Sequence, residues 1–201
     1  MHDAPVDCSD GPVTHPADPS DPATDVTVTA TFCATLVDEW VRAGVTDAVV
    51  SPGSRSTPLA LALVARPELA VHVHLDERAA GFVALGLGLA SGRPAVALTT
   101  SGTAAVELHP AVVEAHQAGV PVLVVTANRP PELFDIGAPQ TVDQTHLFGR
   151  SVRWFAAPGP PSSEAAGSWR SLAARAVIEA TSNPVGPGCA VIEATSNPVG
   201  P

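Results

Sequence analysis

Two loops of this sequence combine an arginine with residues that favour anion binding. The stretch SPGSRST carries Ser54 and Arg55, and Pro58 follows it at the start of a helical pattern. A helix N-terminus offers free backbone N–H groups, and an arginine adds a planar fork of donors that matches a carboxylate or phosphate. The stretch ANRPPEL places Arg129 ahead of two prolines, which hold the chain extended. Either arginine could instead be a salt-bridged or solvated surface residue, so the loops alone leave both readings open.

A carboxylate and a small-residue turn complete the set of chemically suggestive residues. Glu77 follows Asp76 and precedes the apolar pattern AAGFVALGLGLA. A carboxylate in apolar surroundings can share or transfer a proton, but it can equally stabilise the first turn of a helix through the helix dipole. The turn TTSGTA contains Thr100, Ser101 and Gly102 and leads into a helical pattern, so it can present backbone amides to a ligand.

Other motifs favour structural roles. GLGLASG, at residues 86–92, has glycines spaced like a dinucleotide fingerprint, but it lies in a helical pattern before a strand, whereas the fingerprint needs the reverse order. We therefore expect close packing of this helix on a sheet. His72 and His74 are interpreted as structural, and we expect no metal ligands. The cysteines are three in number and widely spaced, which indicates neither a disulfide framework nor a zinc site: Cys8, Cys33 and Cys189.

The elements that must position these residues alternate between strand-like and helical patterns. Strand-like segments are DAVVS, AVHVHLD, PAVALTTS and PVLVVTA, and apolar residues at helical spacing precede, separate and follow them. This order predicts an α/β fold with right-handed crossovers and a parallel sheet that has helices on both faces. Such sheets bind ligands at the carboxyl ends of their strands, so we expect the chemically suggestive loops to share one cleft.

Composition limits the classes of partner. The net charge is −10, all ten basic residues are arginine, and six aspartates lie in the first 25 residues. Nucleic acid is not expected as a partner, because its binding needs clustered positive charge. No signal peptide or membrane-spanning apolar run is present, so we expect a cytoplasmic protein without stable membrane insertion.

The chain divides into three parts. Residues 1–27 are rich in Asp, Pro, Ser and Thr and are expected to be disordered. Residues 28–187 are expected to form one folded domain. The segment AVIEATSNPVGP occurs at 176–187 and again at 190–201. Because repeat architectures do not use such a short perfect copy, residues 188–201 are interpreted as an artefactual or disordered duplication.

Five motifs together resemble the amino-terminal domain of the 2-succinyl-5-enolpyruvyl-6-hydroxy-3-cyclohexene-1-carboxylate synthase family. They are SPGSRSTPL, HLDERAAGFVALGLG, TTSGTA, ANRPPEL and GAPQTVDQ, and the resemblance extends over about residues 29–187. It implies the fold of the pyrimidine-binding domain of thiamine-diphosphate enzymes. It also implies a transferase of menaquinone biosynthesis that decarboxylates 2-oxoglutarate and adds the resulting carbanion to isochorismate.

The resemblance assigns a role to each candidate residue. It implies that Glu77 hydrogen-bonds the pyrimidine N1′ of thiamine diphosphate and that the turn at residues 100–102 contributes to the cofactor site. Ser54, Arg55 and Arg129 would bind substrate carboxylate and hydroxyl groups, and Gln140 would orient the reaction intermediate. Mg²⁺ or Mn²⁺ would be bound by a carboxyl-terminal domain, which, like the central domain, is absent from these 201 residues.

The resemblance also sets the expectations for activity. The family implies a homo-oligomer, at least a dimer, in which a partner subunit completes each cofactor site, so the chain alone is expected to be inactive. Two alternatives stay open. One is the amino-terminal domain of another thiamine-diphosphate carboligase or decarboxylase. The other is a non-catalytic domain that binds a carboxylate ligand or pairs with a separate subunit.

Overall fold

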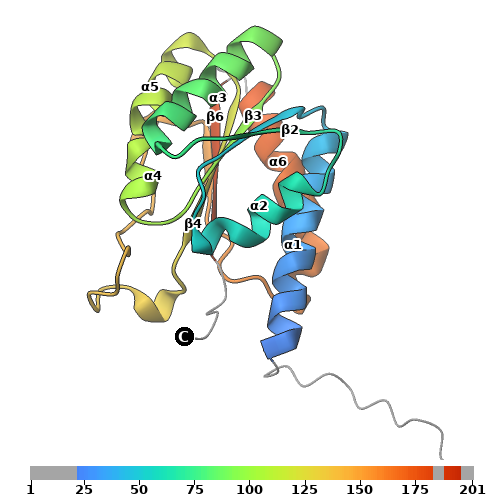
Figure 1. Cartoon of the computed structure of the whole chain (residues 1–201), viewed down its shortest axis with the longest axis vertical. Coiled ribbons are helices and arrows are strands. Elements are labelled where there is room, and N and C mark those ends of the chain that lie inside the picture. The colour runs from blue at the N-terminus through green and yellow to red at the C-terminus, as the bar shows by residue number, and fades with distance from the viewer. Residues whose placement is uncertain (1–21, 183–187, 196–201) are drawn as a thin grey trace, which may run out of the picture.

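The computed structural model describes residues 22–182 and 188–195, which form a six-stranded parallel sheet between two layers of helices (Figure 1). The strands are β1 Asp47–Val50, β2 Ala70–Val73, β3 Ala95–Thr99, β4 Val122–Asn128, β5 Trp154–Ala156 and β6 Cys189–Thr195. The α-helices are α1 Pro22–Arg42, α2 Thr57–Val64, α3 Glu77–Ser91, α4 Thr103–Glu107, α5 His109–Ala118 and α6 Trp169–Thr181. The strand order is β2-β1-β3-β4-β6-β5, and the predicted α/β class is confirmed.

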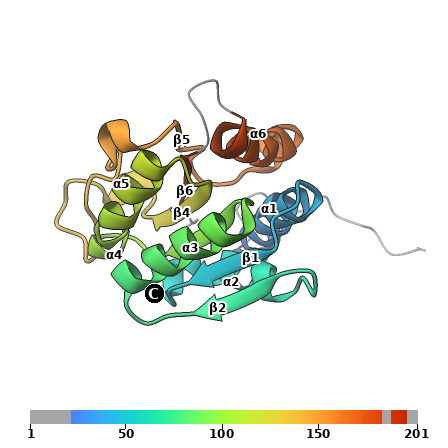
Figure 2. The same cartoon turned by 90° about the horizontal axis from the view of Figure 1, so that it is seen from above.

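Each face of the sheet has its own apolar core. The helices α1, α2 and α6 cover one face, where Leu36, Trp40 and Leu63 are fully buried against alternate residues of the strands. The helices α3, α4 and α5 lie on the opposite side, as the view from above also shows (Figure 2). The inner strands β3 and β4 are buried along their whole length, as expected for parallel strands covered on both faces.

The glycines of GLGLASG serve helix packing. Residues 86–91 lie within α3, and a Cβ on Gly88 would stand 2.6 Å from the backbone oxygen of Pro121. Only a residue without a side chain permits this approach to the segment before β4. The packing interpretation is therefore confirmed for Gly88, whereas Gly86 faces open space.

Some expected boundaries differ from the structure. The helix α1 begins at Pro22, so residues 22–27 are helical, while residues 1–21 lie outside the described part. Proline is favoured in the first turn of a helix. The part of α1 that packs on the sheet stabilises the helix, and adding residues to an existing helix is easier than starting a new one, so α1 extends back to Pro22. The strand β5 was not anticipated, because it has three half-buried residues and a weak pattern.

For the duplicated segment at 188–201, expected to be artefactual or disordered, the disorder alternative is wrong at residues 189–195. Residues 189–195 form β6, an inner strand that pairs with β4 over seven positions and with β5 over three. The remaining residues 196–201 lie outside the described part. The hexapeptide AVIEAT is helical at 176–181 and extended at 190–195. Local propensity cannot separate the two copies, so the strand conformation comes from the backbone partners that the neighbouring strands supply.

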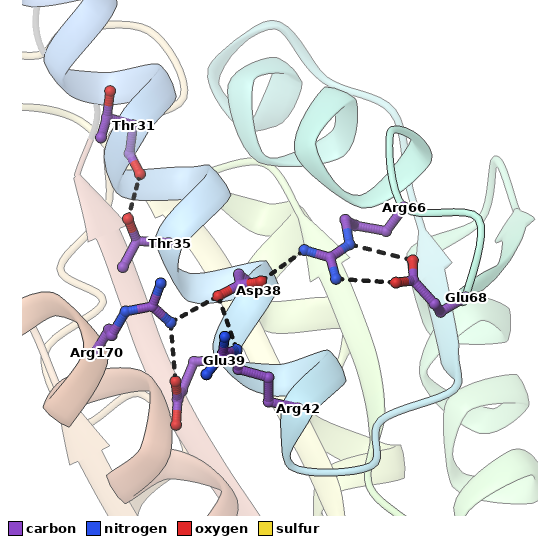
Figure 3. Close-up of polar contacts among 8 residues, drawn as sticks. All are labelled: Thr31, Thr35, Asp38, Glu39, Arg42, Arg66, Glu68 and Arg170. Atoms are coloured by element: carbon purple, nitrogen blue, oxygen red, sulfur yellow. Dashed lines mark hydrogen bonds and ion pairs between the residues drawn. The ribbon is translucent and has the colours of Figure 1, made fainter.

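A cluster of charged side chains joins the helices of one face (Figure 3). Asp38 of α1 accepts hydrogen bonds from Arg66, which follows α2, at 2.8 Å and from Arg170 of α6 at 2.7 Å. Arg66 also pairs with Glu68, and Arg170 with Glu39. These bonds lower the pKa of Asp38 to about 2, with the arginine hydrogen bonds as the main cause.

No helix in the described residues is long and apolar enough to cross a membrane.

Candidate functional site

The loops that follow β1 and β3 meet at the carboxyl end of the sheet. A Cβ on Gly53 would stand 2.4 Å from the Cβ of Thr100, so glycine lets the SPGSRST loop lie directly on the TTSGTA turn. The loop then forms a short 3-10 helix, Ser54–Ser56, in which Ser54 is exposed and Arg55 is half-buried. Two predicted site segments that lie far apart in the sequence are therefore in contact.

Arg129 extends this contact to the end of β4. It is 8% exposed, and its guanidinium donates to the hydroxyl of Ser101 and to the backbone oxygen of Pro139 at 2.9 Å. Burial lowers its pKa, and the positive charge of nearby Arg55 lowers it further. Among the described residues Arg129 has no carboxylate partner. A buried cation without a carboxylate partner is costly, so the guanidinium of Arg129 has the electrostatics of an anion site.

The chain after β4 folds back over the turn at residues 100–102. The backbone oxygen of Gln140 accepts a hydrogen bond from Ser101 Oγ at 3.1 Å, while the Gln140 side chain is exposed. Gln140 has φ of 56°, and a Cβ on Gly102 would stand 3.0 Å from its backbone oxygen. The structure thus brings Gln140 to the same place as Ser101 and Arg129. It also shows that Ser101 already bonds to protein groups.

Gln144 anchors the loop after β4 to the turn at residues 100–102 through side-chain hydrogen bonds. The sequence patterns did not identify Gln144 as a site residue. Its side chain is buried, accepts a hydrogen bond from Gly102 N at 3.0 Å, and donates to the backbone oxygen of Ala127 at 3.1 Å. The backbone N–H of Gly102 is therefore occupied within the protein. The position of a glutamine in the motif GAPQTVDQ was the available signal, but nothing in its local pattern distinguishes a buried amide from an exposed one.

Glu77 lies at the first residue of α3, beyond the end of β2. Asp76 caps the helix by accepting a hydrogen bond from Ala79 N at 2.8 Å, which leaves Glu77 out of the capping role. Glu77 is half-buried, and no hydrogen bond or ion pair joins its side chain to the described residues, Arg55 and Arg129 included. The structure therefore places Glu77 at the same edge of the sheet as the arginine pair but not bonded to it.

A row of buried polar side chains crosses the sheet at this edge. Ser51 follows β1 next to the end of β3, Thr99 pairs with Thr126, and Thr126 pairs with Glu193 of β6. All four are at most 5% exposed. Ser51 Oγ, Thr99 Oγ1 and Glu193 Oε2 are buried without a hydrogen-bond partner among the described residues. Such unsatisfied groups are rare in proteins and mark places where a ligand or water usually completes the bonding.

The hollows around the site differ in character. A pocket of about 290 Å³ lies under the loop after β4 and is lined by Asn128, Phe134, Asp143, Gln144 and their neighbours. A larger groove of about 440 Å³ lies between α1, α6 and the segment after β5, and none of the predicted site residues lines it. The predicted site residues do not line the 290 Å³ pocket either, but Asn128 and Gln144, which bond to Arg129 and Gly102, do.

The fold agrees with a comparison against known families. Residues 30–147 match the family described as "Thiamine pyrophosphate enzyme, N-terminal TPP binding domain", and the chain belongs to this family. Curated relatives carry the name 2-succinyl-5-enolpyruvyl-6-hydroxy-3-cyclohexene-1-carboxylate synthase. The chain is 56% identical to the Thermobifida fusca protein over 154 residues, which is 76% of this chain and 28% of that protein.

Further relatives carry the same name. The chain is 51% identical to the Geobacillus kaustophilus protein over 158 residues, 78% of this chain and 27% of that protein. It is 49% identical to the Haloarcula marismortui protein over 162 residues, 80% of this chain and 27% of that protein. The chain therefore spans little more than a quarter of the length of these curated relatives.

Proposed function

We propose that this chain supplies the pyrimidine-binding half of a 2-succinyl-5-enolpyruvyl-6-hydroxy-3-cyclohexene-1-carboxylate synthase of menaquinone biosynthesis. Its substrates would be 2-oxoglutarate and isochorismate, both of which carry carboxylates. The observation that carries the proposal is the buried guanidinium of Arg129, which lies near Arg55 and has no carboxylate partner of its own among the described residues. A dicarboxylic 2-oxo acid supplies the missing negative charge, and bidentate pairing gives it orientation.

The residues around Glu77 fit the pyrimidine ring of thiamine diphosphate. Glu77 offers a half-buried carboxylate with no partner in the described protein, at the start of the apolar helix α3. Ser51 and Thr99, at the ends of β1 and β3, keep buried hydroxyls unsatisfied among the described residues. When bound, the cofactor supplies the nucleophilic carbon and the electron sink that release of CO₂ from a 2-oxo acid requires.

Each protein group has a defined task in this proposal. Glu77 accepts a hydrogen bond from the protonated ring nitrogen N1′ and so holds a proton where the reaction needs it. Arg55 and Arg129 bind a substrate carboxylate, with Ser54 and the exposed side chain of Gln140 beside them. The turn at residues 100–102 supports the site indirectly, because Ser101 and Gly102 bond to Arg129 and Gln144.

Other parts of the site lie beyond this chain in the proposal. Mg²⁺ or Mn²⁺ would be held by the region of the synthases that this chain does not span, and a second subunit would complete the cofactor site. Exposed apolar side chains on and before α3 support a homo-oligomer, since they offer a surface for a second copy: Leu75, Phe82 and Leu89. A cytoplasmic location accords with this assignment.

The test joins the full chain to the part of the Thermobifida fusca synthase that follows the matched region. The joined protein should release CO₂ from 2-oxoglutarate when thiamine diphosphate, Mg²⁺ and isochorismate are present, whereas the 201-residue chain alone should not. Glu77→Gln should lower this rate at least about 100-fold, because the carboxylate acts in proton transfer. Arg78→Gln, the neighbouring exposed residue, should leave the rate unchanged and serves as the control. A joined protein that uses pyruvate as the acceptor but does not use isochorismate as the acceptor would contradict the proposal.

A further inference from the structure

The strand β6 carries a buried carboxylate, Glu193, that does not contact the arginine pair directly. Glu193 is 5% exposed and lies on the face of the sheet that also carries Val191 and Cys189. Its counterpart in the other AVIEAT copy, Glu179, forms an ordinary ion pair with Arg175, one turn away in α6, at 2.6 Å. The two glutamates share their local sequence, so the difference in environment is due to the fold alone.

Glu193 is the first member of a hydrogen-bonded chain that ends in the arginine pair. Its Oε1 accepts a hydrogen bond from Asn128 Nδ2 at 2.6 Å. The other end of the same amide, Asn128 Oδ1, accepts from the backbone N–H of Arg129 at 2.7 Å. An asparagine amide donates only through its nitrogen, so an acceptor at Glu193 fixes which end of Asn128 faces Arg129.

The contacts of Arg129 carry this orientation into the site. Its guanidinium bonds to Ser101 and to the backbone oxygen of Pro139, and it lies close enough to Arg55 for the two charges to interact. Rotation of the Asn128 amide would leave the buried N–H of Arg129 facing a donor, which costs the desolvation energy of that group. The position of the guanidinium therefore depends on an acceptor that lies two hydrogen bonds away, on another strand.

The surroundings of Glu193 make it a sensitive member of this chain. Its second oxygen, Oε2, is buried without a partner among the described residues. The neighbouring strand β4 presents uncharged Thr126 and Asn128, β5 presents apolar residues, and Asp143 from the loop between them adds negative charge. Burial and then Asp143 raise the pKa of Glu193, although the Asn128 hydrogen bond opposes them.

We propose that Glu193 is a positioning residue for the anion site: through Asn128 it fixes the backbone of Arg129 and thereby the guanidinium that binds a carboxylate. The inference rests on the proposed function, because the anion that Arg129 binds is part of that proposal. Glu193 touches neither substrate nor cofactor in it. It acts on binding, through geometry.

The experiment measures binding of 2-oxoglutarate to the full 201-residue chain, by titration calorimetry and by the arginine side-chain signals in NMR spectra. Glu193→Ala should weaken binding about tenfold, since it removes the acceptor for one buried hydrogen bond. Glu193→Gln keeps an acceptor oxygen and should bind within about twofold of the unchanged chain. Glu179→Ala, at the matching position of the other copy, should have no effect on binding.

A reversal of donor and acceptor separates positioning from simple destabilisation. Asn128→Asp places two carboxyl groups together and should weaken binding about tenfold. Adding Glu193→Gln to it restores a donor–acceptor pair, because the introduced amide donates to one oxygen of the introduced carboxylate while the other oxygen still accepts from the Arg129 backbone. The double variant should recover binding to within about twofold. Backbone amide spectra confirm that each variant is folded, and the Arg129 amide signal should move in Asn128→Asp and return in the double variant.

The outcomes distinguish the two proposals. If Arg129→Ala leaves 2-oxoglutarate binding unchanged, or if neither the unchanged chain nor its fusion to the rest of the Thermobifida fusca synthase binds 2-oxoglutarate, the anion site is wrong and the proposed function fails with it. If Arg129→Ala abolishes binding but the double variant binds no better than Asn128→Asp alone, the anion site stands and the role of Glu193 is overturned.

Discussion

At the scale of single residues, two glycines of one helix have opposite roles. Gly86 and Gly88 both lie in α3, but only Gly88 faces a neighbour, the backbone of Pro121. Gly86→Ala should stabilise the chain by about 0.5–1 kcal/mol, because alanine lowers the conformational entropy of the unfolded state. Gly88→Ala should destabilise it by about 1–3 kcal/mol through overpacking. Urea unfolding measures both, and equal stability of the two variants would contradict the packing role of Gly88.

Glu193 gives a second prediction at this scale. Its folded-state pKa is raised above the ordinary value of 4.5, so the folded state binds its proton more tightly than the unfolded state does. The stabilisation is complete below about pH 4.5 and is lost as pH rises through the raised pKa. The melting temperature of the unchanged chain should therefore fall relative to that of Glu193→Gln as pH rises from about 5 to 8. Parallel melting curves across that range would show that Glu193 ionises normally.

At the scale of helices, Asp38 links three elements through Arg66 and Arg170. Its pKa is lowered to about 2, so this stabilisation is present above the unfolded value of 3.8 and is lost as pH falls toward 2. Asp38→Asn should lower the melting temperature at neutral pH and reduce its acid dependence. Glu68→Gln removes the same charge but only a local partner of Arg66, so its effect should be smaller. A larger effect of Glu68→Gln would mean that Asp38 does not connect the helices.

The strands and helices also show how far sequence patterns reach. Alternating strand-like and helical patterns predicted four strands and the α/β class, because buried parallel strands have strong apolar runs. The four strand-like segments are DAVVS, AVHVHLD, PAVALTTS and PVLVVTA. The same reasoning predicted that Arg55, Ser101 and Arg129 lie close together, because the loops after parallel strands lie at the same edge of the sheet. It did not find β6, because AVIEAT forms a helix at 176–181 and a strand at 190–195.

The unpredicted site residues share a physical cause. Asn128, Gln144 and Glu193 act through hydrogen bonds to groups that are distant in the sequence and lie on other elements. Each is an ordinary polar residue in its own segment. Only the pairing of β4 with β6, and the return of the loop after β4, turn these side chains into a connected network.

At the scale of the whole molecule, the fold depends on which copy of AVIEAT enters the sheet. In α6, the first copy buries Ala176, Val177 and Ala180 in the core that includes α1 and leaves Ile178 55% exposed. In β6, the second copy hydrogen-bonds to strands on both sides and buries Ile192 to 1% exposure. The two isoleucines occupy the same position of the repeat, so they form a matched pair for testing the assignment.

Ile192→Ala should destabilise the chain by about 2–5 kcal/mol, because it empties a fully buried site in the sheet. Ile178→Ala should change the stability by about 0.5 kcal/mol or less, because that side chain is largely exposed and alanine favours helix. Urea unfolding followed by circular dichroism gives both values. Equal and small effects would mean that residues 189–195 do not complete the sheet. A large effect of Ile178→Ala with none of Ile192→Ala would mean that the first copy, and not the second, provides the inner strand.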